Sequence, residues 1–404
     1  MARHSHDRRH LGDIVIFIAL PVTPLTVAMT DLSELIGTTI TPQRSSSGGT
    51  RRRIAVFRAL QLGDMLCAVP ALRAVREGEP DAHITLIGLP WAKEFALRYS
   101  HLVDDFMSFP GMPGLPEQPY RPADAEVFYH AARAREFDLA IQLHGSCALS
   151  NEVARRLDAK ALVGFCASVE EAGLHRGGRE HLVSCPQGNE IERLLVLPHV
   201  LGYPRVASRL EFPLRPQDYV GWKCIASEHD LQADSYVCIH PGARMLSRRW
   251  PWERYAEVAR MLADRWPVVV TGAADEQALA RLLCSQVGAK VINLCGRTSL
   301  GEMGALIAHA RLLVCNDTGV SHIASATETP SVVVSCGTDS WRRAPLDGRR
   351  HRILADYPPC RPCNWEKCPL GHVCATHISV EAVMREIDSL TTVDWGLSHA
   401  CAVA

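Results

Sequence analysis

The chain has 404 residues, of which 47% are hydrophobic and 22% are charged, and this balance excludes a largely disordered or coiled-coil protein. The 43 Lys and Arg nearly cancel the 44 Asp and Glu, so the formal net charge is -1 and no overall basic surface for nucleic acid is expected. The 15 Cys are too few for a disulfide scaffold and mostly lie singly in apolar runs, as in a reducing compartment. At roughly 150 residues per domain, the length predicts two or three domains, and these features together favour a cytosolic enzyme.

The first fifty residues differ from the rest. A basic, His-rich start precedes an apolar run over 14–29 that two prolines interrupt, and residues 44–50 read RSSSGGT, which is typical of a flexible linker. The apolar run is too short and too Pro-interrupted for a membrane-spanning helix. We expect residues 1–50 to form an extension or linker outside the fold, and a membrane-surface anchor or a signal peptide is the alternative.

From residue 51 onward, short apolar segments alternate with helical patterns. In the first part of the chain, strands are predicted over 54–57, 83–87 and 138–143. A helix over 64–77, kinked or restarted at Pro70, follows the first strand. The Pro- and Gly-rich segment 109–122 is predicted to be a loop.

A second alternating series begins at Tyr236. Its predicted strands are 236–240, 268–271, 290–294, 312–315 and 332–335, and its predicted helices start at Trp252, Asp275, Leu300 and Gly319. Strand–helix alternation indicates βαβ units, so we predict an α/β fold with two doubly wound, Rossmann-like domains that face a cleft. The segment 213–234 has weaker periodicity and fits an interdomain connection. The expected divisions are a domain 51–215, a domain 216–390 and a tail 391–404.

The turn after the first predicted strand runs from Arg58 to Asp64 and reads RALQLGD. Ligands of open α/β sheets bind beyond the carboxyl ends of the strands, so this turn is expected to line the cleft. Gly63 would let the backbone pass close to a ligand. Asp64 is either the N-cap of the following helix or a catalytic carboxylate that projects into the site.

The turn NDTGVSH, from Asn316 to His322, also lies between a predicted strand and a helix. Free backbone N–H groups converge at such a helix start and form a site for an anion. The hydroxyl of Thr318 would add a donor, and Gly319 would allow a phosphate to approach closely. An ordinary strand-to-helix turn, capped by Asp317 or Thr318, is the alternative.

Two further turns of the second series carry charged residues. The segment HPGARMLSRRWP contains Gly242 and the pair Arg248 and Arg249, whose guanidinium groups suit a diphosphate, with a solvated charge pair as the alternative. The segment TGAADE places Glu276 past a strand end, where an acid could hold ribose hydroxyls. Together these turns favour a nucleotide site. An NAD site is disfavoured because no GxGxxG follows the first strand.

Four of the 15 Cys lie within one short segment, PPCRPCNWEKCPLGHVC. The four are Cys360, Cys363, Cys368 and Cys374, and His372 precedes the last of them. The segment has too many turn-forming residues for a helix or strand. A four-thiolate zinc site is chemically reasonable, although the spacing is not the usual pair of CxxC motifs. Disulfides and free thiols packed in a loop are the alternatives.

Taken together, these motifs resemble glycosyltransferase family 9, the ADP-heptose:lipopolysaccharide heptosyltransferases. The resemblance covers roughly residues 53–387, and its most specific parts are LGD followed by PAL, HPGA with RRWP, NDTGVSHIA and the CxPC…C…GHxC segment. It implies a GT-B fold, with the acceptor on the N-terminal domain and the donor nucleotide on the C-terminal one. It also implies inverting transfer of a heptose from ADP-L-glycero-β-D-manno-heptose to a Kdo or heptose hydroxyl of the lipopolysaccharide core.

The resemblance assigns roles to particular residues. Asp64 matches the general base that deprotonates the acceptor hydroxyl, and Arg248 stands where members often have a Lys that stabilises the leaving diphosphate, with Arg249 as its alternative. Expected donor contacts are Gly242, Arg249, Glu276 at the ribose, Thr298 near the adenine, Asp317, Thr318, Gly319 and His322. Expected acceptor contacts are Arg58 and Gly63.

The resemblance also bears on cofactors and partners. It implies that turnover needs no metal, because fixed cations and helix N–H groups can stabilise the leaving group, and zinc at the cysteines would be structural. The expected partners are ADP-heptose and a lipid-linked glycan, without nucleic acid, at the inner face of the cytoplasmic membrane. Asn189 replaces a His that members often have, so a family 9 enzyme with a non-lipopolysaccharide acceptor is one alternative. A sugar-nucleotide epimerase and a thiol–metal protein are the others.

Overall fold

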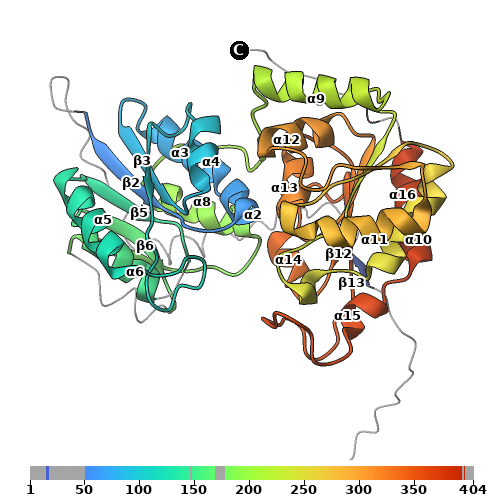
Figure 1. Ribbon diagram of the computed structural model, residues 1–404. Coiled ribbons are helices and arrows are strands. Elements are labelled where there is room, and N and C mark those ends of the chain that lie inside the picture. Colours follow the sequence, from blue (N-terminus) through green and yellow to red (C-terminus); the bar gives the residue numbers. More distant parts are fainter. Residues whose placement is uncertain (1–14, 18–50, 146–147, 169–177, 394, 396–404) are drawn as a thin grey trace, which may run out of the picture.

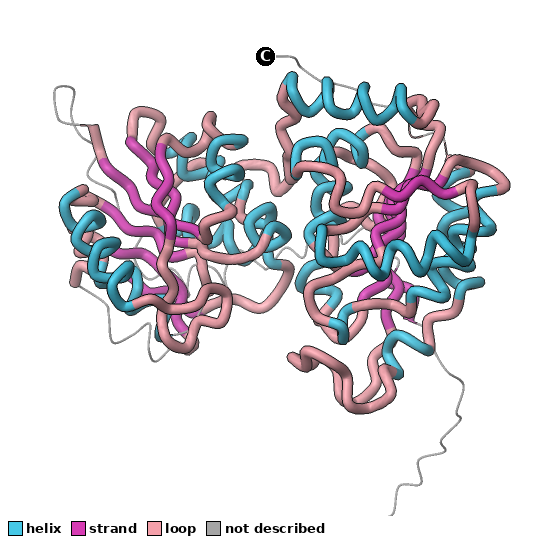
Figure 2. The backbone as a smooth tube through the Cα atoms, in the orientation of Figure 1, coloured by secondary structure: helices cyan, strands magenta, loops and turns pink. Residues whose placement is uncertain are grey.

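The computed structural model describes residues 15–17, 51–145, 148–168, 178–393 and 395. They form two separate sheets that stand side by side, each enclosed by helices (Figures 1 and 2). We term these the N-terminal half, built around strands β2 to β7, and the C-terminal half, built around strands β8 to β13. None of the helices in the described residues is both long and apolar enough to cross a membrane.

The N-terminal half contains a six-stranded parallel sheet in the order β4-β3-β2-β5-β6-β7. Its strands are β2 (Arg53–Phe57), β3 (His83–Gly88), β4 (Asp105–Ser108), β5 (Leu139–Gln142), β6 (Leu162–Cys166) and β7 (Glu180–Ser184). Its helices are α2 (Leu62–Cys67), α3 (Val69–Gly78), α4 (Ala92–Arg98), α5 (Pro122–Ala134), α6 (Ala148–Arg156) and α8 (Glu190–Val200). Strands β3 and β4 are added on one side of β2, and strands β5 to β7 on the other. The switch point between β2 and β5 is where doubly wound sheets bind their ligands.

The C-terminal half repeats this order as β10-β9-β8-β11-β12-β13. Its parallel strands are β8 (Val237–His240), β9 (Val268–Val270), β10 (Val291–Asn293), β11 (Leu312–Asn316), β12 (Ser331–Ser335) and β13 (His351–Ala355). Its helices are α9 (Pro216–Glu228), η1 (Leu246–Arg248), α10 (Trp252–Ala263), η2 (Ala274–Glu276), α11 (Gln277–Val287), α12 (Leu300–Ala308), α13 (Gly319–Ala326), α14 (Ser340–Arg343), α15 (Val373–Thr376) and α16 (Val380–Thr391). Both sheets thus have the strand order of a Rossmann fold, which confirms the predicted α/β class.

The predicted helix over 64–77 is divided into α2 and α3. Ala68 joins the two helices, and Pro70 is the second residue of α3. At that position proline costs no hydrogen bond, because the first N–H groups of a helix have no intrahelical acceptor. The predicted restart at Pro70 is therefore confirmed, and α2 is left as a separate short helix that points at the C-terminal half.

The segment 213–234 is more ordered than expected. Instead of a mere connection it contains α9, which packs on α12 so closely that a side chain at Gly221 would clash with the side chain of Glu302. Only Asp218 and Ala226 of α9 are buried. A helix with so small an apolar face has weak periodicity, which is why the sequence pattern missed it.

Residues 15–17 form strand β1 (Val15–Phe17), although the segment 1–50 is expected from the sequence to contribute nothing to the fold. This strand pairs antiparallel with β13 at the edge of the C-terminal sheet, with Val15 opposite Ala355. The remainder of the apolar run, the RSSSGGT linker and most of the predicted tail lie outside the described residues. Strand β1 completes the seven-stranded sheet and covers an edge that would otherwise be open.

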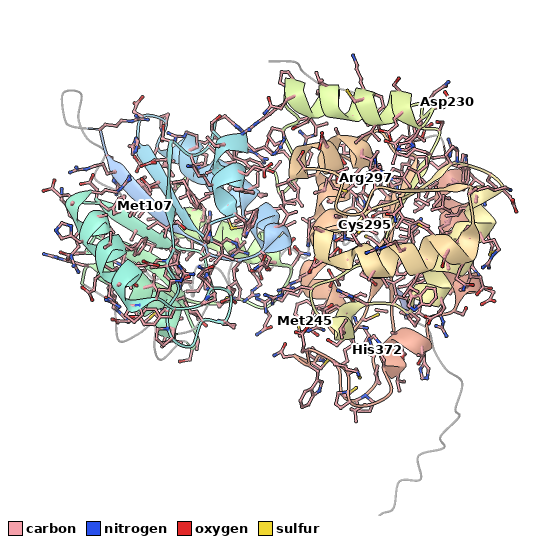
Figure 3. The ribbon with its side chains drawn as sticks, viewed as in Figure 1. Met107, Asp230, Met245, Cys295, Arg297 and His372 are labelled. Carbon is pink, nitrogen blue, oxygen red and sulfur yellow. The ribbon has the colours of Figure 1, made fainter. Side chains whose placement is uncertain are left out.

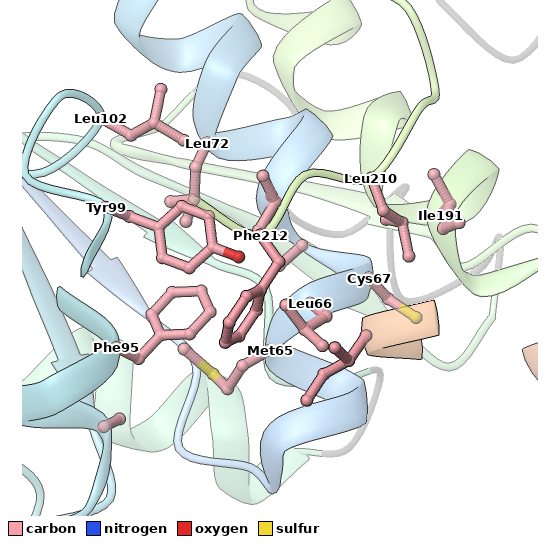
Figure 4. Packing of buried hydrophobic residues seen from close by; sticks show 14 of the residues in the cluster. Met65, Leu66, Cys67, Leu72, Phe95, Tyr99, Leu102, Ile191, Leu210 and Phe212 are labelled. Carbon is pink, nitrogen blue, oxygen red and sulfur yellow. The ribbon is translucent and has the colours of Figure 1, made fainter. Parts of the chain in front are cut away.

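One buried core extends from the N-terminal half into the C-terminal half. Figure 4 shows its part around α2, where Phe212 of the connecting segment lies near Met65, Leu66 and Tyr99. On its other side Phe212 packs against α12, since a side chain at Gly304 would clash with its ring. The two sheets are therefore linked by continuous apolar packing, and this packing sets the position of α2.

Candidate active site at the junction of the halves

Two short helices from opposite halves, α2 and α13, meet near their N-termini. A Cβ at Gly63 would lie 2.8 Å from His322 Cδ2 and 3.4 Å from Gly319 Cα, and a Cβ at Gly319 would lie 3.1 Å from the side chain of Leu62. Both glycines, expected at ligands, are thus needed for the contact between the helices. This contact brings the LGD turn and the NDTG turn to one place.

Asp64 is the third residue of α2, and the N-cap is Gln61. The alternative that Asp64 caps the helix is therefore wrong. Its Oδ1 lies 3.2 Å from Arg343 Nη2 of α14, which belongs to the C-terminal half. The nearby carboxylate of Asp64 is the main reason that the pKa of Arg343 is raised. The side chain of Asp64 is 18% exposed, so it sits in the junction and still reaches solvent.

The buried side chain of Arg58 forms hydrogen bonds that hold this turn in place. Its side chain is 1% exposed, its Nε donates to Asp64 O at 2.8 Å, its Nη1 donates to Leu143 O, and its Nη2 lies 3.3 Å from Glu190 Oε1. In the structure Arg58 therefore links α2, the end of β5 and α8. Its expected contact with an acceptor stays a prediction.

Glu190 is a residue that the sequence did not single out. Its carboxylate accepts from Arg342 Nε at 3.0 Å and from Arg193 Nη1 at 2.8 Å, in addition to the contact with Arg58. Burial alone would raise the pKa of Glu190, but the three guanidinium groups outweigh burial and lower the pKa to about 2. Arg342 comes from α14, so this ionic cluster also crosses the junction.

Asn189, where the family often has His, is the N-cap of α8. Its Oδ1 accepts from Ile191 N at 3.0 Å, and its Nδ2 donates to Ala344 O at 2.8 Å, just past α14. One side chain thus caps a helix of the N-terminal half and binds the backbone of the C-terminal half. The departure from the family pattern falls on a residue that connects the halves.

Replacing Glu190 by Gln is expected to destabilise the fold at neutral pH by about 3 kcal/mol, because three arginines lose their counter-charge. The pKa of Glu190 is depressed in the folded chain, from 4.5 to about 2. Its stabilising contribution is therefore complete above about pH 5 and is lost as the pH falls towards 2. Urea unfolding of wild type and Glu190→Gln at several pH values tests this. The exposed Glu192, in the same helical turn, provides the matched control Glu192→Gln, and equal behaviour of both variants would contradict the assignment.

On the donor side, Asn316 ends β11 and is fully buried. Its Oδ1 accepts from Trp250 N at 2.8 Å, and its Nδ2 donates to Pro241 O at 2.8 Å and Gly242 O at 3.1 Å. These bonds fasten the loop after β8 to the loop after β11, at the switch point of the C-terminal sheet. From the sequence, Asn316 belongs to the NDTG motif without a role of its own, and its position at the end of a buried strand is the signal that could have found this role.

The start of α13 has two features of an anion site, and the carboxylate of Asp317 lies beside them. Asp317 Oδ2 accepts from Thr338 Oγ1 at 2.6 Å, which orients the carboxylate. Thr318 is the N-cap, and its hydroxyl is buried without a hydrogen-bond partner among the described residues. Since buried hydroxyls are normally paired, this one indicates a place for a ligand. The free N–H groups of the first turn and the positive end of the helix dipole both lie at this N-terminus, and both favour an anion.

The two expected cations lie on the loop that Asn316 holds. Arg248 donates through Nη1 to Cys336 O at 3.3 Å and through Nη2 to Cys363 O, and partial burial lowers the pKa of its guanidinium. Arg249 donates through Nε to Ala243 O at 2.7 Å. Each arginine thus has a backbone anchor that fixes the position of its guanidinium group.

Glu276 lies directly against Gly242. Its Oε2 accepts from Ala273 N at 2.9 Å, and its Oε1 is 3.5 Å from Arg249 Nη2. A Cβ at Gly242 would clash with the carboxylate of Glu276, so only glycine leaves room for it. Thr298 follows β10 on the loop whose Cys295 and Arg297 are labelled in Figure 3, and its hydroxyl is also buried without a partner in the described residues.

His322 was expected at the donor, but the structure places it in the contact between α2 and α13. It is 3% exposed, its ring covers Gly63, and its Nδ1 is 3.7 Å from Cys67 Sγ. Burial is the main cause that lowers the pKa of His322. Its expected contact with the donor stays a prediction.

The cysteine segment is not assembled as a metal site. All four of its cysteines are free thiols, and no group of three or more His, Cys, Asp or Glu in the described part of the chain could hold a metal ion. The expected four-thiolate zinc site and the disulfide alternative are both absent there. The segment instead supports the donor loop: His372 (Figure 3) places its Nε2 2.9 Å from Ser247 O, and Cys363 O accepts from Arg248.

Two Rossmann-ordered halves, with a carboxylate on one and a helix start suited to phosphate on the other, have the architecture of the GT-B fold. The profile of glycosyltransferase family 9 (heptosyltransferase) matches residues 127–374. The chain belongs to this family and is a glycosyltransferase.

Relatives and solved structures agree with this placement. The chain is 27% identical over 295 residues to lipopolysaccharide heptosyltransferase 3 of Escherichia coli, covering 69% of this chain and 83% of that protein. It is 27% identical over 368 residues to lipopolysaccharide heptosyltransferase 2 of Escherichia coli K12, covering 84% and 98%. The structure of Escherichia coli ADP-heptose LPS heptosyltransferase II has a TM-score of 0.63 at 20% identity, covering 84% of this chain and 98% of that one. This likeness confirms the GT-B fold.

Proposed function

We propose that this enzyme transfers a heptose, with inversion, from ADP-L-glycero-β-D-manno-heptose to a hydroxyl of the lipopolysaccharide core, a Kdo or heptose acceptor. Membership of family 9 supports the choice of sugar. The names of the relatives, which are lipopolysaccharide heptosyltransferases, support the choice of acceptor. The acceptor is lipid-linked, so the reaction takes place at the inner face of the cytoplasmic membrane.

The observation that carries the proposal is the meeting of α2 and α13. The helix with Asp64 and the helix with Asp317 and Thr318 come into contact at Gly63 and Gly319, with 3.4 Å between a Cβ placed on Gly63 and the Cα of Gly319. A donor phosphate at the start of α13 would therefore present its sugar close to Asp64. A transferase needs this arrangement, because its base and leaving group act on two sides of one anomeric carbon.

The reaction then proceeds by a single displacement. Asp64 takes the proton from the acceptor hydroxyl as its oxygen bonds to the anomeric carbon, and the bond from that carbon to the diphosphate oxygen breaks. ADP leaves with the electron pair. Arg248, Arg249 and the N–H groups of α13 stabilise the charge that develops on the diphosphate, and no metal ion is assigned a role in this step. Glu276 and Thr298 hold the nucleoside.

Calorimetric titration with ADP, UDP and NAD tests the donor assignment. We expect selective binding of ADP and about tenfold weaker ADP binding by Thr318→Val, because this change removes one hydrogen bond to phosphate and keeps the side-chain shape. Thr327, at the other end of α13, gives the control Thr327→Val; its hydroxyl donates to Ile323 O within the helix.

A preference for UDP would contradict the proposed donor and favour another transferase donor or an epimerase. If ADP is selected, transfer assays with ADP-heptose follow, using truncated lipopolysaccharide core and a protein acceptor in parallel. Transfer to the protein alone would replace the proposed acceptor with a non-lipopolysaccharide one. Transfer to the core alone supports the proposal in full.

A further inference from the structure

We propose that Arg343 is a positioning residue for the catalytic base: it holds Asp64 from the opposite half, so that the base is correctly oriented only when the two halves are together. This inference rests on the proposed role of Asp64 in the transfer reaction. It concerns a residue that belongs to none of the motifs recognised in the sequence.

The first support is the geometry around the carboxylate. Arg343 Nη2 lies 3.2 Å from Asp64 Oδ1, and within the described residues no other side chain forms a hydrogen bond or ion pair with this carboxylate. The second oxygen, Oδ2, is therefore left for the acceptor hydroxyl. One fixed oxygen and one free oxygen is the arrangement that aims a carboxylate base at a proton.

The second support is the way in which Arg343 is attached to the donor turn. Thr338, just before α14, donates to Asp317 Oδ2 at 2.6 Å, and Ser340 N, the first residue of α14, donates to Tyr357 OH at 3.1 Å. The short segment from Thr338 to Arg343 thus contacts the proposed donor site at one end and the proposed base at the other. A change at the donor turn would be transmitted to Asp64 over a few residues.

The third support is a comparison with Arg342. Its side chain is 42% exposed and that of Arg343 is 41% exposed, and both cross the junction from α14. Arg342 binds Glu190, however, which is held by two further arginines, whereas Arg343 binds the carboxylate that faces the acceptor. A partly exposed ion pair contributes little to stability by itself. The value of the Arg343 pair therefore lies in orientation more than in holding the halves together.

The test measures kcat of heptose transfer by the full chain in the steady state, with saturating ADP-heptose and lipopolysaccharide core. We expect the kcat of Arg343→Gln to be about tenfold lower than that of Arg342→Gln, because neighbouring groups that act together couple by about this amount. The affinity for ADP should be unchanged. Arg343→Lys should recover part of the loss, since the ammonium keeps the charge without the planar fork. Arg342→Gln removes an ion pair across the same junction and so measures the purely structural effect.

The decisive measurement repeats both changes in an Asp64→Asn background. If Arg343 acts through Asp64, Arg343→Gln causes no further loss there, while Arg342→Gln still adds its own effect. Equal kcat values for the two single variants, or an undiminished effect of Arg343→Gln in the Asp64→Asn background, would overturn the inference alone. An Asp64→Asn variant that transfers heptose at the wild-type rate would instead overturn the proposed function, and the inference with it.

Discussion

Replacing Asp64 by Asn is expected to lower the rate of heptose transfer by about a thousandfold while ADP still binds normally. Asn has nearly the shape of Asp and leaves the backbone of α2 in place. The backbone carbonyl oxygen of residue 64 still accepts a hydrogen bond from Arg58. It cannot accept the proton of the acceptor hydroxyl. The loss should therefore appear in kcat, with little change in the binding of ADP to the other half.

Transfer assays and ADP calorimetry on the same preparation measure both quantities. Asp124 lies in the first turn of α5 and is exposed, so Asp124→Asn is the same chemical change at a helix start of the same half. It should leave transfer and ADP binding as they are. If Asp64→Asn loses ADP binding together with transfer, Asp64 is a structural residue and the base must be found elsewhere.

The second large effect is expected at Asn316. Its replacement by Ala removes three hydrogen bonds and leaves Trp250 N without its acceptor in a fully buried place. We expect a loss of about 3 kcal/mol in the free energy of unfolding, because buried polar groups left unpaired carry the full cost of desolvation. ADP affinity should fall at least about tenfold as well, since the loop with Arg248 and Arg249 loses its anchor.

Denaturant unfolding and ADP titration of Asn316→Ala measure these effects. Asn293 ends β10, at the edge of the same sheet; it is only partly buried, and in the described residues its side chain accepts one hydrogen bond, from Cys295 N at 3.0 Å. Asn293→Ala should therefore cost much less. A destabilised Asn316→Ala that binds ADP with unchanged affinity would show that the two loops hold their places without it, and would contradict its role in the donor site.

Much of the fold could be predicted, because buried parallel strands produce short apolar runs with clear ends. Strands β2, β3, β5, β8 and β11 agree with the expected segments within a few residues. Several of the missed elements depend on tertiary contacts, although the fully buried strand β6 and the amphipathic helix α16 were missed as well. Helix α9 has two buried residues, and β4 and β7 are edge strands with several polar residues. None of these has a periodicity of its own.

The residues of the candidate site also fall into those that the sequence could predict and those that it could not. Asp64, Asp317 and Thr318 could be found because each follows a strand within a recognisable turn. Glu190, Arg342 and Arg343 could not be found, because each of them forms an ion pair with a residue of the other half. The burial of Arg58 and its contacts with α2, the end of β5 and α8 could not be predicted for the same reason. Local motifs predict which turns form the site, whereas the contacts between the halves are a property of the folded chain.

The strand β1 has a consequence for the order in which the molecule forms. It is synthesised before every other strand, yet its partner β13 is the last strand of its sheet to leave the ribosome. Strand β1 must therefore wait until β13 has been made, and the outer edge of β13 stays uncovered until the long loop between the two strands closes, which is slow. During that interval the sheet has an open edge that can pair with another chain. We expect newly made protein to be most prone to aggregation at this late stage, after both halves have folded.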